Sequence, residues 1–296
     1  MAEALPTLGV IGGSGLYEMA ALGDVEHVQL STPFGHPSDD FVVGTLGQVR
    51  VVFLPRHGRG HRLLPSEINF RANLWGMKHL GVEWLVAVSA VGSLREEIRP
   101  GHLVVPHQFL DRTSRRVSTF FGNGIVAHVS FADPVCPTLS KLLVEVARRE
   151  GATVHEGGTY LCMEGPQFST RAESHLYRQW GADVIGMTNV QEAKLAREAE
   201  ICFATLALAT DYDCWHESEA DVAIADVLRI LQANVALAQK IVAGVAGGLP
   251  LERRCPCANA LEHAIITERS RIPEHVRHDL RPLLAKYLKQ WEGSAE

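Results

Sequence analysis

The sequence predicts an α/β fold with a largely parallel or mixed central sheet and helices packed around it. Short apolar runs alternate with segments of helical spacing along most of the 296 residues, a pattern typical of α/β domains. A hydrophobic content of 46% is enough for a substantial core in a chain of this length. Several apolar runs are followed directly by polar or glycine residues, which places candidate binding groups at one edge of the sheet.

The predicted strands are apolar runs that end in residues suited to chemistry. Residues 201–209 are the clearest example, because this short run is nearly all apolar, as expected for a strand buried on both faces. The other predicted strands span residues 8–11, 49–54, 84–88, 158–163 and 184–187.

The predicted helices combine helical spacing with recognisable first and last residues. Residues 66–79 begin with a serine after Pro65 and stop before Gly81. The remaining helices are predicted over residues 137–150, closed by Gly151, residues 170–180, closed by Gly181, residues 189–199, capped by Asn189, and residues 220–245.

The glycine and proline cluster at residues 247–250 is the best domain boundary in the sequence. We therefore divide the chain into a main domain, residues 1–248, and a helical C-terminal extension, residues 249–296. Helices are predicted in the extension over residues 258–266 and 273–291.

The extension also carries the motif Cys255-Pro256-Cys257. The motif is compatible with an ordinary turn, with a redox pair, or with a metal site that includes His263. One Cys-x-Cys motif supplies too few ligands for a metal by itself, which disfavours the third interpretation.

Composition and charge exclude several kinds of partner. The formal net charge is −6 and no long cluster of lysine or arginine is present, so nucleic acid and anionic membranes are not expected as partners. No apolar run is long enough to span a membrane, and the N-terminal segment lacks the regions of a signal peptide. We expect a cytoplasmic protein whose six cysteines are mostly buried thiols.

A glycine loop, residues 12–16, follows the first predicted strand. Its glycines allow backbone N–H groups to approach an anion, and the Ser14 hydroxyl adds a donor. The loop lacks the third glycine of a dinucleotide fingerprint and the Gly-Lys-Ser/Thr of a P-loop, so neither a nicotinamide cofactor nor ATP is supported. By itself, the loop is also compatible with a plain tight turn.

The segment Arg-His-Gly-Arg-Gly-His at residues 56–61 follows another predicted strand. An arginine fork holds a phosphate through two parallel hydrogen bonds, and a histidine adds another. A metal site made by His57 and His61 is disfavoured by the neighbouring arginines and by the missing glutamate of a His-Glu-x-x-His helix. A structural basic loop is the remaining alternative.

Hydroxyl and small residues end two further predicted strands, at Ser89-Ala90 and at Met187-Thr188. Hydroxyls and backbone N–H groups at such positions bind anions. One such strand end carries little weight, but several with the same chemistry predict a shared phosphate-binding site.

Two carboxylates, Asp211 and Asp213, follow the run 201–209. One buried aspartate holds a proton for a leaving nitrogen, and its neighbour accepts a hydrogen bond from an exocyclic amine, a pair of roles that suits a purine. The loop residue Phe168 is placed to stack on the base. The structural alternatives are a solvated acidic turn and a core phenylalanine.

In combination, these motifs resemble the trimeric purine nucleoside phosphorylase family, and within it the enzymes that act on 5′-methylthioadenosine. The resemblance covers residues 8 to about 245 and rests on the segments 11–16, 32–35, 56–59, 92–97, 164–166, 171–174 and 209–215. It implies a three-layer α/β/α sandwich around a mixed sheet, with residues 1–248 as the nucleoside phosphorylase domain. It also implies a homotrimer whose active sites are completed by a neighbouring subunit, with no metal or organic cofactor.

The resemblance assigns roles to individual residues. The phosphate site would consist of Ser14, Arg56, His57, Ser89, Ala90 and Thr188. Met187 would lie near the ribose and Phe168 near the purine. The 5′-methylthio pocket would consist of His128, Ile224, Val227 and Leu228, with His128 reaching across from the neighbouring subunit.

The sequence departs from the family pattern in three places. Ser14 and Ser89 stand where threonine is more usual, which keeps the hydroxyl donor and removes a methyl group. The tail with its Cys-Pro-Cys motif is absent from animal enzymes and similar to that of some microbial members. The apolar contact that an animal C-terminus makes with the methylthio group therefore cannot be transferred to this chain.

The predicted reaction is reversible phosphorolysis of 5′-methylthioadenosine to adenine and 5-methylthioribose 1-phosphate, in purine and methionine salvage. Phosphate attacks C1′ while Asp211 protonates N7, and Asp213 anchors the base or orients Asp211. Two carboxylates with no amide favour a 6-aminopurine over a 6-oxopurine. The alternatives are a phosphorylase of inosine, guanosine or methylthioinosine, a phosphate-independent hydrolase, and a non-catalytic nucleoside-binding protein. The sequence leaves trimer and hexamer open.

Overall fold

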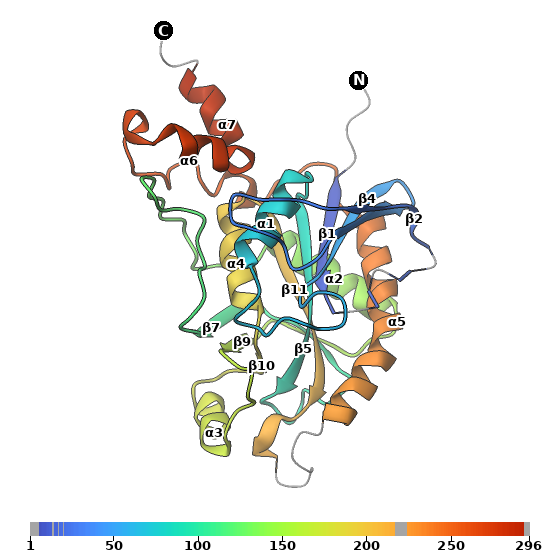
Figure 1. Ribbon diagram of the computed structural model, residues 1–296. Coiled ribbons are helices and arrows are strands. Elements are labelled where there is room, and N and C mark those ends of the chain that lie inside the picture. The colour runs from blue at the N-terminus through green and yellow to red at the C-terminus, as the bar shows by residue number, and fades with distance from the viewer. Residues whose placement is uncertain (1–5, 14, 17, 20, 217–223, 293–296) are drawn as a thin grey trace.

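A computed structural model describes residues 6–13, 15, 16, 18, 19, 21–216 and 224–292, with the backbone alone for residues 224–233 and 292. The described part is a three-layer α/β/α arrangement (Figure 1). The central sheet separates α2 (Pro137–Arg149) and α5 (Ile224–Gly248) from α1 (Phe70–His79) and α4 (Asn189–Glu198). The predicted α/β class with a mixed central sheet is confirmed.

The sheet is mixed and centres on one long strand, β5. The described strands are β1 (Thr7–Gly12), β2 (Gly23–Val28), β3 (Phe41–Leu46), β4 (Val49–Pro55), β5 (Trp84–Ser93), β6 (Leu103–Val105), β7 (Gln108–Arg112), β8 (Val154–Glu156), β9 (Thr159–Met163), β10 (Val184–Gly186) and β11 (Cys202–Asp211). Their order is β2-β3-β4-β1-β5-β10-β9-β7, and β11 pairs with β5 and with β6, which pairs with β8. β1, β4, β5 and β11 run parallel, whereas β10 runs antiparallel to β5.

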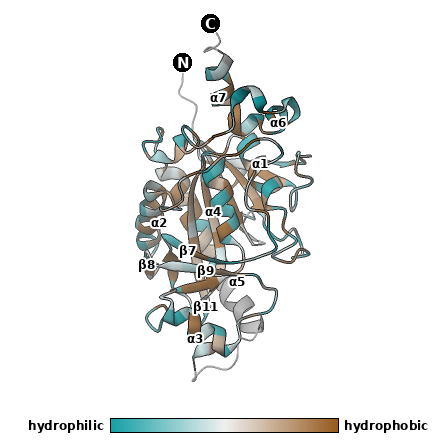
Figure 2. Ribbon diagram, turned by 90° about the vertical axis from the view of Figure 1, so that its left-hand side faces the viewer, coloured by the Kyte–Doolittle hydropathy of each residue, from teal (hydrophilic) through white to brown (hydrophobic). Residues whose placement is uncertain are grey.

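The central strands are buried on both faces, which explains their nearly continuous apolar sequences. All six residues of β1 are buried, and only Asp211 in β11 is partly exposed. One apolar cluster lies under α1 and α4 and includes Leu74, and another lies under α2 and α5 and includes Leu139. In Figure 2 the strands at the centre are mostly brown and the surrounding loops are largely teal.

Most predicted elements are found, with several exceptions. The predicted strands 8–11, 49–54, 158–163, 184–187 and 201–209 correspond to β1, β4, β9, β10 and β11. The prediction omits β2, β3, β6, β7 and β8. β2 is exposed along its length and β6 and β8 have three residues each, so these strands lack an apolar run long enough to be recognised.

One helix start and one helix cap differ from the prediction. α1 begins at Phe70 and not at Ser66, because the Asn69 side chain accepts a hydrogen bond from the Ala72 N–H and caps the helix. α4 does begin at Asn189, but its N-cap is Thr188. The helices predicted over 137–150 and 170–180 are confirmed as α2 and α3 (Arg171–Gln179), the latter preceded by a capping box.

The C-terminal segment differs most from its prediction. No α-helix covers the described residues 258–266, where the short 3₁₀ helix η2 (Pro256–Asn259) is followed by turns. The helix predicted over 273–291 is divided into α6 (Glu274–Asp279) and α7 (Arg281–Glu292). Pro282 explains the division, because it has no backbone N–H with which to continue the hydrogen bonding of α6.

The C-terminal segment packs on the main body of the molecule. Tyr287 is buried in the same apolar cluster as Trp75, and the Trp75 indole N–H donates to the Asp279 carbonyl oxygen at 2.9 Å. α5 ends at Gly248, where the domain boundary was predicted. The division into two domains stays a prediction. Among the described helices, none combines the length and apolar character needed to cross a bilayer.

β5 is longer than the predicted strand 84–88 and changes its partner along one edge. Residues 84–87 pair with β1 and residues 92–93 pair with β10, whereas the other edge pairs with β11. Residues 88–91 therefore face no strand on the first edge, and Ala90 is exposed although it lies in a central strand. Ser89 and Ala90 thus lie within β5, which corrects the prediction that they follow its end. The diverging neighbours leave an opening in the sheet, as at the binding crevices of other α/β sheets.

Glu198, at the end of α4, is a buried acid beside the long segment that follows β7. It accepts hydrogen bonds from the Thr119 hydroxyl and from the Phe120 N–H, both at 2.7 Å. Burial outweighs these hydrogen bonds and raises the pKa of Glu198 from 4.5 to about 7.

We expect Glu198→Gln to become progressively more stable than the unsubstituted protein as the pH rises from about 5 to about 8. The folded-state pKa lies above the unfolded one, so the contribution of Glu198 to stability is complete below pH 4.5 and is lost as the pH rises through about 7. The gain is at most ~3 kcal/mol. Urea unfolding across this range measures it, with Glu145→Gln on the exposed face of α2 as control. If the difference in free energy of unfolding between the two proteins does not change with pH, the raised pKa of Glu198 is contradicted.

Candidate active site

The ends of three strands meet at the opening beside residues 88–91 of β5. β1 and β4 run parallel to β5 or to each other, so the loops that follow them, starting at Gly13 and Arg56, lie on the same side of the sheet. β10 runs antiparallel to β5 from its pairing at Ser93, so the residues after β10, Met187 and Thr188, return toward the opening. The sheet topology therefore brings the described positions among those predicted to bind phosphate to one side of the sheet.

Arg56 is held at the opening by a buried ion pair with Glu192 of α4. Its Nε donates to Glu192 Oε1 at 2.5 Å and its Nη2 to Oε2 at 3.0 Å, and both side chains are almost completely buried. Nη1 donates to the Val88 carbonyl oxygen at 3.0 Å and Nη2 to that of Ile11 at 3.3 Å. The guanidinium thus bridges β1, β5 and α4, and most of its five N–H bonds are used within the protein.

His57 is a neutral histidine whose free nitrogen is an acceptor. Its Nδ1 lies 2.8 Å from the Leu63 carbonyl oxygen, which only accepts hydrogen bonds, so Nδ1 carries the hydrogen. Burial, supplemented by the charges of Arg56 and Arg116, lowers the pKa of His57 to about 4. Nε2 is therefore left with a lone pair near neutral pH. The His57 ring also stacks on His61, with centroids 4.1 Å apart.

Two hydroxyl residues at the opening are buried and have spare hydrogen-bonding capacity. The Ser89 hydroxyl lies 3.2 Å from the Tyr160 hydroxyl and 3.3 Å from the Ala90 carbonyl oxygen. Thr188 is the N-cap of α4, yet its side chain makes no capping hydrogen bond to the helix. Ser14, the third predicted hydroxyl, lies outside the described residues.

Asp211 and Asp213 lie beside the far end of β5. Asp211 is the last residue of β11 and pairs with Gly92. Its Oδ1 accepts the Asp213 N–H at 2.8 Å, and its Oδ2 lies 2.7 Å from the Thr210 hydroxyl. The solvated acidic turn is therefore wrong: Asp211 is partly buried and Asp213 is buried.

Asp213 is the more strained and more deeply buried member of the pair. Its φ of +52° lies in the left-handed region, which non-glycine residues rarely adopt. Burial of the carboxyl raises its pKa. Its Oδ2 has no hydrogen-bond partner among the described residues. A hydrogen bond from a ligand amine, or a proton on the carboxylate, would remove the cost of burying this unpartnered oxygen.

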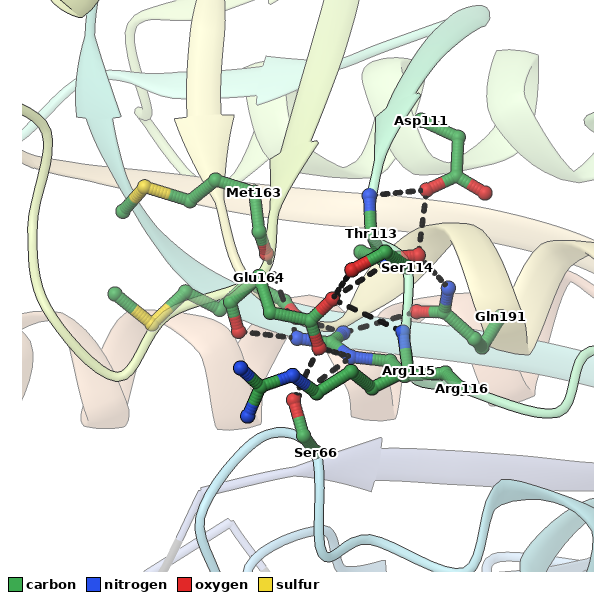
Figure 3. Close-up of polar contacts among 10 residues, drawn as sticks. Ser66, Asp111, Thr113, Ser114, Arg115, Arg116, Met163, Glu164 and Gln191 are labelled. Carbon is green, nitrogen blue, oxygen red and sulfur yellow. Dashed lines mark hydrogen bonds and ion pairs between the residues drawn. The ribbon is translucent and has the colours of Figure 1, made fainter.

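A network around Glu164 and Arg116 fixes the loops beside Met187 (Figure 3). The Glu164 carboxylate accepts from the Ser66 hydroxyl, from the Ser114 N–H at 2.5 Å and from Arg116 Nε at 3.2 Å. Burial opposes ionisation of Glu164, but these hydrogen bonds and the Arg116 charge hold its pKa at about 2. Arg116 also donates to the carbonyl oxygens of Met187 and Glu164.

The predicted base and ribose residues lie on the loops that this network holds. Phe168 follows the Glu164 loop and is 49% exposed, so the core alternative is wrong and its ring is free to meet a ligand. Met187 is half-buried, and its Sδ lies only 2.5 Å from the place a Cβ on Gly165 would occupy. Any side chain at residue 165 would therefore displace Met187.

The residues predicted for the methylthio pocket come from two segments, one before the C-terminal segment and one in α5. The segment of His128 packs on the C-terminal segment, where the His128 N–H donates to the Ala264 carbonyl oxygen at 2.9 Å. α5 lies on the opposite side of the molecule (Figure 1), and the side chains of Ile224, Val227 and Leu228 lie outside the described residues. His128 instead lines a hollow of 470 Å³ together with Phe121 and Val129.

Several polar residues that organise the site were not predicted from the sequence. Glu192, Gln191 and Asn189 are all buried in the first turn of α4, although a helix start is ordinarily exposed. Three polar residues among the four that follow Thr188, a predicted binding residue, were the available signal. The dense arginines near residue 116 were a second signal, since Arg116 is almost completely buried.

Comparison with known proteins gives consistent matches over nearly the whole chain. A model of the Phosphorylase superfamily matches residues 7–246. The chain is 60% identical to an S-methyl-5′-thioadenosine phosphorylase of Geobacter sulfurreducens, over 95% of this chain and 99% of that protein.

Solved structures give the same result. A methylthioadenosine phosphorylase sourced from an antarctic soil metagenomic library has a TM-score of 0.91 and 48% identity, covering 95% of this chain and 99% of its own. A mutant adenosine/methylthioadenosine phosphorylase of Schistosoma mansoni, solved with methylthioadenosine, has a TM-score of 0.77 and 37% identity, covering 83% of this chain and 93% of its own. The strand arrangement, the converging strand ends and these matches show that the chain belongs to the phosphorylase superfamily.

Proposed function

We propose that the chain catalyses the reversible phosphorolysis of 5′-methylthioadenosine to adenine and 5-methylthioribose 1-phosphate. One observation carries this proposal: hydroxyls, an imidazole and an arginine gather at the opening in β5, while the two aspartates flank the end of the same strand. Anion-binding groups lie on one side of the opening and the acid pair on the other. This arrangement suits phosphate on one side and the purine of a nucleoside on the other. The names of the relatives agree with this activity.

The phosphate would occupy the unpaired edge of β5. Ser89 and Ala90 line that edge, and Thr188, Ser14, His57 and Arg56 surround it in the proposal. Because Arg56 is largely engaged by Glu192, its main contribution is a positive charge beside the anion and one remaining N–H. His57 would accept a hydrogen bond from a phosphate hydroxyl through Nε2.

The transition state explains why the anion and the acid pair belong together. Cleavage of the glycosidic bond leaves positive charge on the ribose and negative charge on the departing purine. Phosphate below the sugar stabilises the first charge, and a proton donor at N7 neutralises the second. The proposed reaction uses inorganic phosphate as co-substrate, and none of its steps involves a metal or an organic cofactor.

Asp211 is proposed as the proton donor and Asp213 as the base anchor. The Thr210 hydroxyl lies within hydrogen-bond distance of both the Val91 carbonyl oxygen, at 3.2 Å, and Asp211 Oδ2, at 2.7 Å. A hydroxyl carries one hydrogen, so both contacts are satisfied together when Asp211 is protonated. The unpartnered Oδ2 of Asp213 suits an acceptor for the 6-amino group of adenine.

The methylthio pocket is proposed to form between subunits of a homotrimer. His128 is exposed, and the segment after β7 that carries it lies on the other side of the molecule from α5 (Figure 1). In this arrangement His128 of one subunit meets Ile224, Val227 and Leu228 of another, and Met187 and Phe168 contact the ribose and the purine. We further propose that the enzyme works in the cytoplasm, in purine and methionine salvage.

A phosphate-dependent assay over four nucleosides tests the proposed substrate. We expect kcat/KM to be highest for methylthioadenosine, lower for adenosine and much lower for methylthioinosine and inosine, because a carboxylate repels the 6-oxo group. Adenine release without phosphate would indicate a hydrolase. A higher kcat/KM for inosine or methylthioinosine would overturn the substrate assignment.

Asp211→Asn tests the proton donor. We expect kcat for methylthioadenosine to fall by about 10²–10⁴-fold, the usual contribution of general acid catalysis. A riboside with a nitrophenolate leaving group departs without being protonated. With this substrate we expect Asp211→Asn to lower kcat far less. Asp213→Asn is the matched comparison and should raise KM more than it lowers kcat. An unchanged kcat for Asp211→Asn rules this residue out as the acid.

Glu192→Gln tests the support of the phosphate site. The substitution leaves the Arg56 charge buried without its counter-charge, so we expect a loss of about 3–5 kcal/mol in the free energy of unfolding. Phosphate KM should rise as well, because Arg56 is no longer fixed. Urea unfolding and phosphate saturation kinetics measure the two effects, with the exposed Glu145→Gln as control. Wild-type stability in Glu192→Gln would refute the structural role of the pair.

A further inference from the structure

Four of the six cysteines form one compact buried cluster outside the active site. Cys136, Cys202, Cys255 and Cys257 are all buried, and their Sγ atoms all lie within 4.8 Å of one another. Cys136 precedes α2, Cys202 begins β11, and the other two flank Pro256 of η2. Three separate segments of the chain thus converge on one point.

The distances suit a metal ion at the centre of the cluster. Cys255 Sγ lies 3.3 Å from Cys202 Sγ and 3.6 Å from Cys136 Sγ. Four thiolates at the usual Zn–S distance of about 2.3 Å in a tetrahedron are separated by about 3.8 Å from one another. All four cysteines are free, so no pair is joined as a disulfide.

The backbone around the cluster is fixed. The Cys136 N–H donates to the Phe203 carbonyl oxygen at 2.7 Å and the Cys202 N–H to that of Glu83 at 2.9 Å. On the C-terminal side, Arg253 donates to the Glu200 carbonyl oxygen at 2.7 Å and the Leu261 N–H to the Glu200 carboxylate at 3.0 Å. Ligands on such a scaffold need little rearrangement to bind a metal.

We propose that Cys136, Cys202, Cys255 and Cys257 form a structural zinc site that fastens the C-terminal segment to the phosphorylase domain. Four thiolates with no open position are typical of structural zinc, whereas catalytic zinc keeps a position for water. The four thiols release their protons to solvent as the metal binds, and no redox step is involved. Cys136 also stands at the positive end of the 13-residue helix α2, which favours thiolate.

This site revises the interpretation of the Cys-Pro-Cys motif. The motif supplies only two ligands, and the other two come from the main domain. His263, the partner considered from sequence, is exposed and not part of the cluster. The site lies at the first residue of the ten-residue β11, whose last residue is Asp211, so about 30 Å separates it from the proposed proton donor. Its role is therefore structural.

Metal and thiol analysis of the full chain tests the proposal. The protein is purified without metal-chelating resin, and zinc is measured by mass spectrometry. We expect about one zinc per chain, released by a mercurial reagent that titrates the cluster thiols. Replacement by Co²⁺ should give the charge-transfer and intense visible bands of a tetrahedral thiolate site. This spectrum is a readout of coordination that does not depend on enzymatic activity.

Substitutions locate the site. In the double variant Cys255→Ser, Cys257→Ser we expect zinc content and cobalt bands to be lost and the melting temperature to fall. Cys162→Ala removes a buried thiol outside the cluster, and it should keep full zinc content. If the double variant does not fold, the cobalt spectrum of the unsubstituted chain still decides the question.

Two outcomes would overturn the proposal. One is a metal-free protein with fewer than six free thiols after denaturation without reductant, which would mean that the cluster forms disulfides. The other is six free thiols together with no cobalt thiolate bands after reconstitution, which would mean that the cluster consists of ordinary buried thiols.

Discussion

The ion pair between Arg56 and Glu192 holds together the parts of the sheet that diverge around the site. The guanidinium reaches the carbonyl oxygens of Val88 and Ile11 and is clamped from α4 by the carboxylate. Taking two charges out of water is costly, so such a pair persists only when nearly all of its hydrogen bonds are made. The hydrogen bonds that satisfy Arg56 are therefore the same ones that keep the edge of β5 open.

A second buried charge network holds the other wall of the site on the same principle. Glu164 and Arg116 tie the loop before α3 to the segment after β7, and Arg116 also fixes the backbone of Met187. Polar groups fixed before a ligand arrives need no reorganisation during the reaction, which is the physical basis of electrostatic preorganisation.

The sequence was sufficient to predict the class of fold and the chemistry at the strand ends. Short apolar runs marked β1, β4 and β11, and Arg56, Thr188 and Asp211 follow or end strands that meet at the opening. The full length of β5 was not predictable, because Ser89 interrupts its apolar pattern and only pairing with β11 shows that the strand continues. Glu192 and the cysteine cluster were missed for a related reason. Each acquires its role from partners more than fifty residues away, and local pattern carries no information about such contacts.

The neutral state of His57 has a consequence for which anions the proposed phosphate site accepts. Its Nδ1–H donates a hydrogen bond to the Leu63 carbonyl oxygen, so the imidazole presents a lone pair at Nε2. An anion that meets a lone pair must itself carry a hydrogen, or the two repel each other. Hydrogen phosphate carries one near neutral pH, whereas sulfate, of similar size and charge, carries none. Through its hydrogen bond to His57, the Leu63 carbonyl oxygen thereby makes the opening select anions by their protonation state as well as by their charge.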